Sequence, residues 1–128
     1  MSSYWIKRPR KNKYGNKKTK IIFKGVEVEV DSIKEANRAK ELELMEKAGE
    51  ISELKMQVPF ILQEAFKDAN GKKHSAIKYV ADFTYFLVKG DKYIYTIEDV
   101  KSPVTRKNAV YRLKKKMMAY QGYEITEV

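Results

Sequence analysis

The residues of this chain best suited to chemistry are two aspartates and a lysine in neighbouring apolar segments. Residues 97–101 read Ile-Glu-Asp-Val-Lys, and because side chains alternate along a strand, Asp99 and Lys101 are expected on the same face. Asp82 interrupts the apolar segment that comes before. If a turn centred on Gly90-Asp91 joins the two segments, antiparallel pairing places Asp82 opposite about residue 99. The pattern therefore predicts two carboxylates and a lysine at one place.

Such a group of side chains suits the cleavage of phosphodiester bonds. Carboxylate oxygens hold hard divalent cations such as Mg²⁺, which acidify a bound water and neutralise charge on phosphate oxygens. A nearby lysine stabilises the same charge or orients the attacking water. The alternative is structural, a partly exposed ion pair of Asp99 and Lys101 beside a turn, but Asp82 opposite them favours chemistry. We expect Mg²⁺ as the cofactor, with Mn²⁺ able to substitute.

Periodicity indicates the elements that would position these residues. Alternation over residues 21–30 around Lys24-Gly25 predicts a β-hairpin. A helix with one apolar side follows, with Ser32 and Glu35 as a capping box at its start, and it ends near Gly49. Residues 51–66 contain a strand, which a proline at position 59 marks as an edge or bulged strand.

The second half of the chain continues with strands, turns and a further helix. A polar turn is expected over residues 68–73, with His74 in an exposed loop, followed by strands over 77–88 and 93–100. A helix over residues 105–120 precedes a last short strand over 123–128, and its predicted apolar side comprises Ala109, Val110, Leu113, Met117 and Tyr120. The crossover from strand through helix to strand implies a parallel pair, so a mixed α/β sheet is expected.

The motif and the element order together resemble a known nuclease superfamily. Ala81-Asp82, then sixteen residues, then Asp99-Val100-Lys101 resembles the PD-(D/E)XK motif, with alanine in place of its proline. That superfamily has a core of helix, three strands, helix and strand, which residues 32–128 match. The resemblance implies a restriction-endonuclease-like fold with a mixed central sheet, extended here by the N-terminal hairpin and a basic arm.

More narrowly, the chain resembles small phage-encoded proteins of that superfamily that are Holliday-junction-resolvase-like. The resembling stretches are Ser32-x-x-Glu35, residues 48–51, Gln57, residues 81–83 and residues 98–101. This narrower resemblance implies a substrate of branched DNA. Cutting two strands symmetrically needs two sites, so a homodimer is expected as well.

The resemblance also implies a role for each matching residue. Asp82 and Asp99 would be metal ligands, with the carbonyl of Val100 as a further ligand, and Lys101 would be the catalytic lysine. Glu35 matches a glutamate that completes the metal and catalytic site in related resolvases, although it can equally serve the helix cap with Ser32.

Two further polar residues adjoin this set. Glu98 lies next to the motif but should face away from Lys101, which favours a supporting or salt-bridging role. Gln57 is expected either to support the site or to make a hydrogen bond at a strand end.

The positive charge of the chain is concentrated in two places. Of 27 Lys and Arg residues, nine lie in residues 1–24 without an acid, which leaves 18 against 17 acidic residues in the remainder. Six more basic residues lie between positions 106 and 116, again without an acid. Basic clusters favour a polyanion such as DNA. The expected DNA-binding residues are Lys7, Arg8, Arg10, Lys11 and Lys13 in an arm of residues 1–19, and Arg106, Lys107, Arg112, Lys114, Lys115 and Lys116 in one nuclease domain of residues 20–128.

Composition excludes several other classes of function. No cysteine and a single histidine exclude disulfides, cysteine–histidine catalysis and histidine-rich zinc sites. No apolar segment has the length of a membrane span or of a signal peptide, so an intracellular protein is expected, in the bacterial cytoplasm if it is phage-encoded. The residues predict a metal-dependent DNA endonuclease, and the resemblance implies that it resolves branched DNA such as Holliday junctions during phage recombination or DNA processing. The alternatives are a nickase or restriction-like cutter of ordinary duplex, and a non-catalytic nucleic-acid-binding protein.

Overall fold

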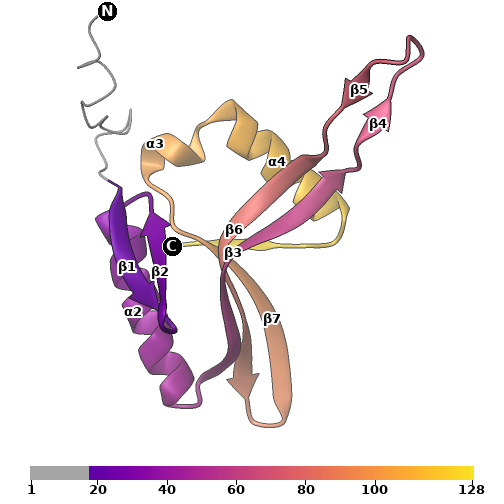
Figure 1. The fold of residues 1–128 in the computed structure, drawn as a ribbon. Helices are drawn as coiled ribbons and strands as arrows, with labels where there is room; N and C mark the ends of the chain where they lie inside the picture. The colour runs from indigo at the N-terminus through magenta and orange to yellow at the C-terminus, as the bar shows by residue number, and fades with distance from the viewer. Residues whose placement is uncertain (1–17) are drawn as a thin grey trace, which may run out of the picture. The chain divides into compact units, whose positions relative to one another are not determined.

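A computed structural model describes residues 18–128, which group into two compact units, residues 18–40 and 41–128. The described part of the first unit contains strands β1 (Thr19–Phe23) and β2 (Val26–Val30) and the first part of helix α2 (Ile33–Lys47). The second unit contains the end of α2 and all later elements (Figure 1). Its central feature is a mixed sheet, as the sequence predicts.

The ends of the hairpin and of α2 follow the predicted turn and cap residues. β1 pairs antiparallel with β2 from Phe23 opposite Val26 onward, so the turn falls at the predicted Lys-Gly pair. The Oγ of Ser32 accepts a hydrogen bond of 3.1 Å from the backbone N–H of Glu35, which caps the helix. At the other end Gly49 has a φ of 81°, which favours glycine and allows the paired closing bonds of a Schellman motif.

Four strands make up the sheet of the second unit. β3 (Ile51–Gln63), β6 (Ile77–Lys89), β7 (Lys92–Asp99) and β8 (Ile125–Glu127) are ordered β3-β6-β7-β8. The pairs β3–β6 and β6–β7 are antiparallel, and β7–β8 is the predicted parallel pair. Pro59 lies on the edge strand β3 and pairs in register with Val80, so the bulges of that strand fall elsewhere.

Strands β3 and β6 are continued by a narrow ribbon of β4 (Phe66–Lys67) and β5 (Lys73–His74), which Figure 1 shows extending from their ends. The turn is closed by Asp68, whose Oδ1 accepts hydrogen bonds from the backbone N–H groups of Asn70 and Lys72. The loop position predicted for His74 is wrong. Its Nε2 lies 2.8 Å from Oδ2 of Asp68, and its ring stacks on Phe66 within the ribbon.

The single helix predicted over residues 105–120 is in fact two helices, α3 (Pro103–Arg106) and α4 (Ala109–Tyr120). Each has its own N-cap. The Oγ of Ser102 accepts from the backbone N–H of Thr105, and the Oδ1 of Asn108 accepts from that of Tyr111. Because a capping asparagine adopts an extended backbone, the chain changes direction at Asn108 before α4 begins.

The predicted apolar side of α4 is correct only for Met117, which packs against the core. Val110, Leu113 and Tyr120 are 61%, 58% and 93% exposed, whereas Tyr111 and Met118 are buried. The last two join a core cluster with residues from all four strands, namely Leu62, Tyr79, Ala81, Ile97 and Ile125. The helix thus packs on the sheet through Tyr111 and Met118, seven residues apart, with Met117 beside them.

Candidate active site

The two predicted aspartates meet where β7 ends beside the middle of β6. Lys89 pairs with Lys92 across the predicted two-residue turn, and the register continues to Phe83 opposite Glu98. The next position on each strand is Asp82 and Asp99, so the predicted pairing is confirmed. Asp82 is half-buried, and its Oδ2 accepts a 2.8 Å hydrogen bond from the backbone N–H of Val100. This contact fixes the first residue after β7.

Lys101 joins the carboxylates on the predicted side. Its Nζ lies 3.3 Å from Oδ1 of Asp99 and 4.8 Å from the ring centre of Tyr111. The Lys101 side chain is 18% exposed and that of Asp99 is wholly buried, so this is not the exposed ion pair of the structural alternative. The ring holds the ammonium beside the carboxylate by a cation–π contact.

Asp99 occupies an unfavourable position for an ionised carboxylate. Its Oδ2 accepts a short 2.5 Å hydrogen bond from the hydroxyl of Tyr79. Within residues 18–128 its buried Oδ1 has no hydrogen bond, although Lys101 provides an ion pair there. Burial, together with a hydrogen bond to Asp82 and the charge of Asp82, raises the pKa of Asp99 from 3.8 to about 7. Because the carboxyl groups of Asp82 and Asp99 are within hydrogen-bond reach of each other, the pair favours either a shared proton or a bound cation.

A second polar network is connected to Lys101 through Tyr111. The hydroxyl of Tyr111 donates a 2.5 Å hydrogen bond to Oε2 of Glu127 on β8. The same carboxylate lies 3.2 Å from Nζ of Lys115 and 3.7 Å from Nε of Arg106. The hydrogen bond from Tyr111, followed by the contacts with the basic side chains, holds the pKa of Glu127 below its ordinary value. Lys101 is therefore linked through one tyrosine to the basic helices.

The strand end that carries the site is also held by backbone hydrogen bonds. The N–H of Val128 donates to the carbonyl of Asp99 at 2.9 Å, and the N–H of Lys101 donates to the carbonyl of Val128 at 3.2 Å. The parallel register places Glu127 opposite Asp99. The C-terminal strand thus brings both an acid and a backbone clamp to the site.

The two supporting residues predicted from the sequence are found in different surroundings. Glu98 is fully buried, and its Oε2 accepts a 2.6 Å hydrogen bond from the hydroxyl of Tyr85, away from the aspartates. Gln57 has a φ of 55°, which is rare outside glycine, at the β3 position opposite Asp82 in the register. Strained backbone of this kind is typical of functional sites.

Comparison with protein families places the chain in one of them. Residues 11–127 match the family model described as "Protein of unknown function (DUF1064)". The chain belongs to the DUF1064 family. No curated protein and no solved structure matches it.

In this DUF1064 protein the structure does not test the predicted role of every ligand. Glu35 is buried in the first turn of α2, in the other unit, and its role as a ligand stays a prediction. Among residues 18–128, no three Asp, Glu, His or Cys side chains form a group that could hold a metal. Asp82, Asp99 and the carbonyl of Val100, all in the second unit, stay predicted ligands.

The predicted DNA-binding residues fall into two clusters, and the structure describes only the second. Those of the second cluster lie on α3, on α4 and in the turn between them, close in sequence to Lys101. The predicted residues of the arm, Lys7 to Lys13, lie outside the described residues. In the same described part, no helix has the length and apolar composition of a membrane span.

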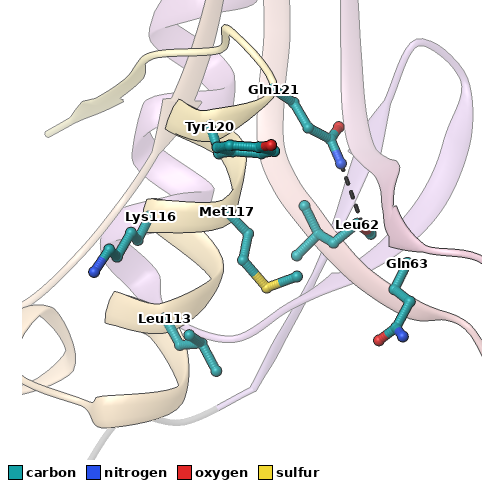
Figure 2. Close-up of a pocket in the computed structure, with 7 residues that line it drawn as sticks. All are labelled: Leu62, Gln63, Leu113, Lys116, Met117, Tyr120 and Gln121. Carbon is teal, nitrogen blue, oxygen red and sulfur yellow. Dashed lines mark hydrogen bonds between the residues drawn. The ribbon is translucent and has the colours of Figure 1, made fainter.

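One hollow in this DUF1064 protein is lined by other residues than the aspartates. It has a volume of about 640 Å³ and is bounded by α4 and the end of β3 (Figure 2). Leu113, Met117 and Tyr120 line it from the helix and Leu62 from the strand, and Nε2 of Gln121 donates to the carbonyl of Leu62 at 3.3 Å. Its lining is mostly apolar and contains no carboxylate, histidine or cysteine.

Proposed function

We propose that this protein is a metal-dependent DNA endonuclease with the restriction-endonuclease-like arrangement that its motif implies. The observation that carries the proposal is the meeting of Asp82, Asp99 and Lys101 where β7 ends beside β6, with Lys101 Nζ 3.3 Å from Asp99. Phosphodiester hydrolysis needs carboxylates for a cation and a positive group for the developing charge. All three groups come from the second unit.

The donor set fits a hard divalent cation. Asp99 presents a buried Oδ1 without a hydrogen bond from residues 18–128, and burial beside Asp82 raises its pKa to about 7. Burial is the largest cause of this rise, and a cation between the carboxylates would offset both the burial of the charge and the contribution of Asp82. Mg²⁺ commonly uses only one or two protein carboxylates and keeps several waters, so two aspartates suffice. When bound, the metal would supply an acidified water and charge neutralisation at the phosphate.

The remaining chemistry belongs to the residues of the chain. Asp82 is oriented by the N–H of Val100, and Asp99 is oriented by the hydroxyl of Tyr79. Lys101 lies beside Asp99 over the ring of Tyr111, so its ammonium can stabilise negative charge on a phosphate oxygen. Glu35 is proposed to complete the site, with Ser32 as its cap partner.

The basic residues of α3 and α4 are proposed to hold the DNA backbone beside this site. Contacts with phosphates do not depend on base sequence, which suits an enzyme that recognises DNA shape. We therefore propose branched DNA as the substrate, and a homodimer as the form that cuts two strands. Light scattering of the purified protein with and without a four-way junction tests the dimer.

Cleavage assays test the proposed activity. A four-way junction and a linear duplex of matched sequence are incubated with the protein, in Mg²⁺ and in chelator. We expect cutting of the junction that requires the metal and falls at least roughly 100-fold in Asp99→Asn and Lys101→Ala. Asp91→Asn and Lys89→Ala, which make the same changes at the exposed β6–β7 turn, serve as controls and are expected to cut normally.

The outcomes separate the proposal from its alternatives. Equal cutting of junction and duplex would favour a nickase or restriction-like enzyme and remove the branched substrate. Tight binding of DNA without cutting in any metal would favour a non-catalytic nucleic-acid-binding protein. Cutting that survives both substitutions would show that the chemistry lies elsewhere in the chain.

A further inference from the structure

The basic helices and the last strand enclose a second hollow, separate from the apolar one. It has a volume of about 400 Å³ and is lined by Ala119, by the acid Glu127 and by four basic residues, Arg106, Arg112, Lys115 and Lys116. Four positive groups and one carboxylate leave a net charge of +3 in the lining. The volume is that of about thirteen water molecules, enough for a phosphate group.

The carboxylate of Glu127 already occupies an anion position in this hollow. Lys115 and Arg106 contact its two oxygens at 3.2 and 3.7 Å, and Tyr111 donates a hydrogen bond to it. These are the kinds of donor that a phosphate oxygen takes from a protein. Both basic side chains are 43% exposed, so an anion from solvent can reach them.

The hollow also adjoins the proposed catalytic lysine through shared residues. Tyr111 contacts Lys101 with its ring and Glu127 with its hydroxyl. Glu127 in turn lies opposite Asp99 in the β7–β8 register. A phosphate bound here would therefore be close along the DNA backbone to the bond that is cut.

We infer that this basic hollow binds a phosphate of the DNA backbone, and that Glu127 takes the place of that phosphate in the free protein. The inference rests on the proposed function, and it assigns Glu127 as a competitor that DNA must displace. Displacement frees the hydroxyl of Tyr111, so binding at the hollow and the position of Lys101 are coupled. Glu127 thus favours release of the product, since it competes for the same basic side chains.

The experiment measures DNA binding in chelator, where no cutting interferes. Fluorescence anisotropy with a labelled four-way junction is recorded over a salt series for the wild type and Glu127→Gln. We expect Glu127→Gln to bind about three- to ten-fold more tightly, because two partly exposed ion pairs no longer oppose binding. The salt dependence should become steeper, by up to about one further phosphate contact.

A matched control removes the same charge nearby. Glu124→Gln lies three residues earlier and outside the lining of the hollow, and it should change the affinity by less than about two-fold. Equal effects of the two substitutions would overturn the inference, since only the net charge would then matter. Lys115→Gln is the second variant if Glu127→Gln fails to fold, and DNA binding unchanged from the wild type in Lys115→Gln would also overturn it.

Two further measurements identify the ligand and distinguish a failure of this inference from a failure of the proposed function. Inorganic phosphate is added to the wild type, and we expect weak competition with DNA. Stabilisation of the protein by phosphate without any competition would assign the hollow to a small anion and overturn the DNA assignment. Cutting in Mg²⁺ is measured on the same samples. If the protein cuts DNA but Glu127→Gln does not bind it more tightly, only this inference is overturned. If Glu127→Gln binds DNA more tightly but no protein cuts it, only the proposed nuclease activity is overturned.

Discussion

Replacing Asp99 by asparagine is expected to stabilise the metal-free protein at pH 8, even though it should abolish cutting. The pKa of Asp99 is raised from 3.8 to about 7 by burial and by Asp82, with Lys101 and Tyr79 acting in the opposite direction. Between these two pH values the folded state holds a proton that the unfolded state has released. Stability therefore falls as the pH rises through this range, and the full loss is present above pH 7.

The size of the effect follows from the same values. A rise from 3.8 to about 7 corresponds to about 4 kcal/mol at pH 8. The favourable charge of Lys101 is already included in this pKa, so a gain of about 4 kcal/mol is expected for the variant at pH 8. For a protein of this size, that gain raises the melting temperature by about 12–20 °C.

Urea unfolding followed by circular dichroism, in chelator and from pH 4 to pH 8, measures the difference between variant and wild type. The difference should be close to zero at pH 4 and grow steadily towards pH 8. Asp91→Asn, at the exposed β6–β7 turn, is the control and should show no such growth. An Asp99→Asn protein that is less stable than the wild type at pH 8, or a difference independent of pH, would refute the reasoning.

Three further results are expected. Mg²⁺ should raise the melting temperature of the wild type at pH 8 but not that of Asp82→Asn, because a ligand that binds only the folded state stabilises it; equal shifts would argue against a site at the aspartates. Gly49→Ala should lower the free energy of unfolding by about 1–2 kcal/mol, since φ is 81° there, and an unchanged urea midpoint would contradict the helix end described above. Tyr120→Ser should change stability by less than about 0.5 kcal/mol, because the side chain is 93% exposed; a loss above about 1 kcal/mol would show that it is covered in solution.

Features with local causes could be predicted from the sequence. The two-residue turn at Gly90-Asp91 sets the register of β6 and β7, and that register places Asp82 beside Asp99. Alternation then separates Lys101 from Glu98, as the contacts of both residues confirm. Each of these inferences needed only neighbouring residues and one hairpin.

Features with distant causes could not be predicted in this way. Tyr79 and Asp82 are three residues apart on one strand, so alternation gives no reason to expect both at Asp99. Tyr111 was missed because Val110 and Leu113 complete a better apolar stripe than Tyr111 and Met118 do. The structure buries the tyrosine because its hydroxyl reaches Glu127, sixteen residues away.

The acid Glu127 had one detectable signal. It follows Ile125 by two residues in a short strand expected to pair with β7, so a carboxylate near Asp99 could have been foreseen. Its ion pairs with Arg106 and Lys115 could not have been foreseen, since they depend on where α3 ends and α4 begins.

The backbone clamp between Val128 and the strand end at Asp99 has a consequence for the order of folding. β6 and β7 form a hairpin from neighbouring residues, which is a fast step, whereas the parallel contact with β8 must wait until α4 is in place. The segment that carries Lys101 is therefore among the last to become ordered and among the first to open. Amide exchange at Lys101 and Val128 would report this opening directly. A bound cation or DNA strand would slow that exchange, because it would stabilise the segment that carries Lys101, which the free protein holds only weakly.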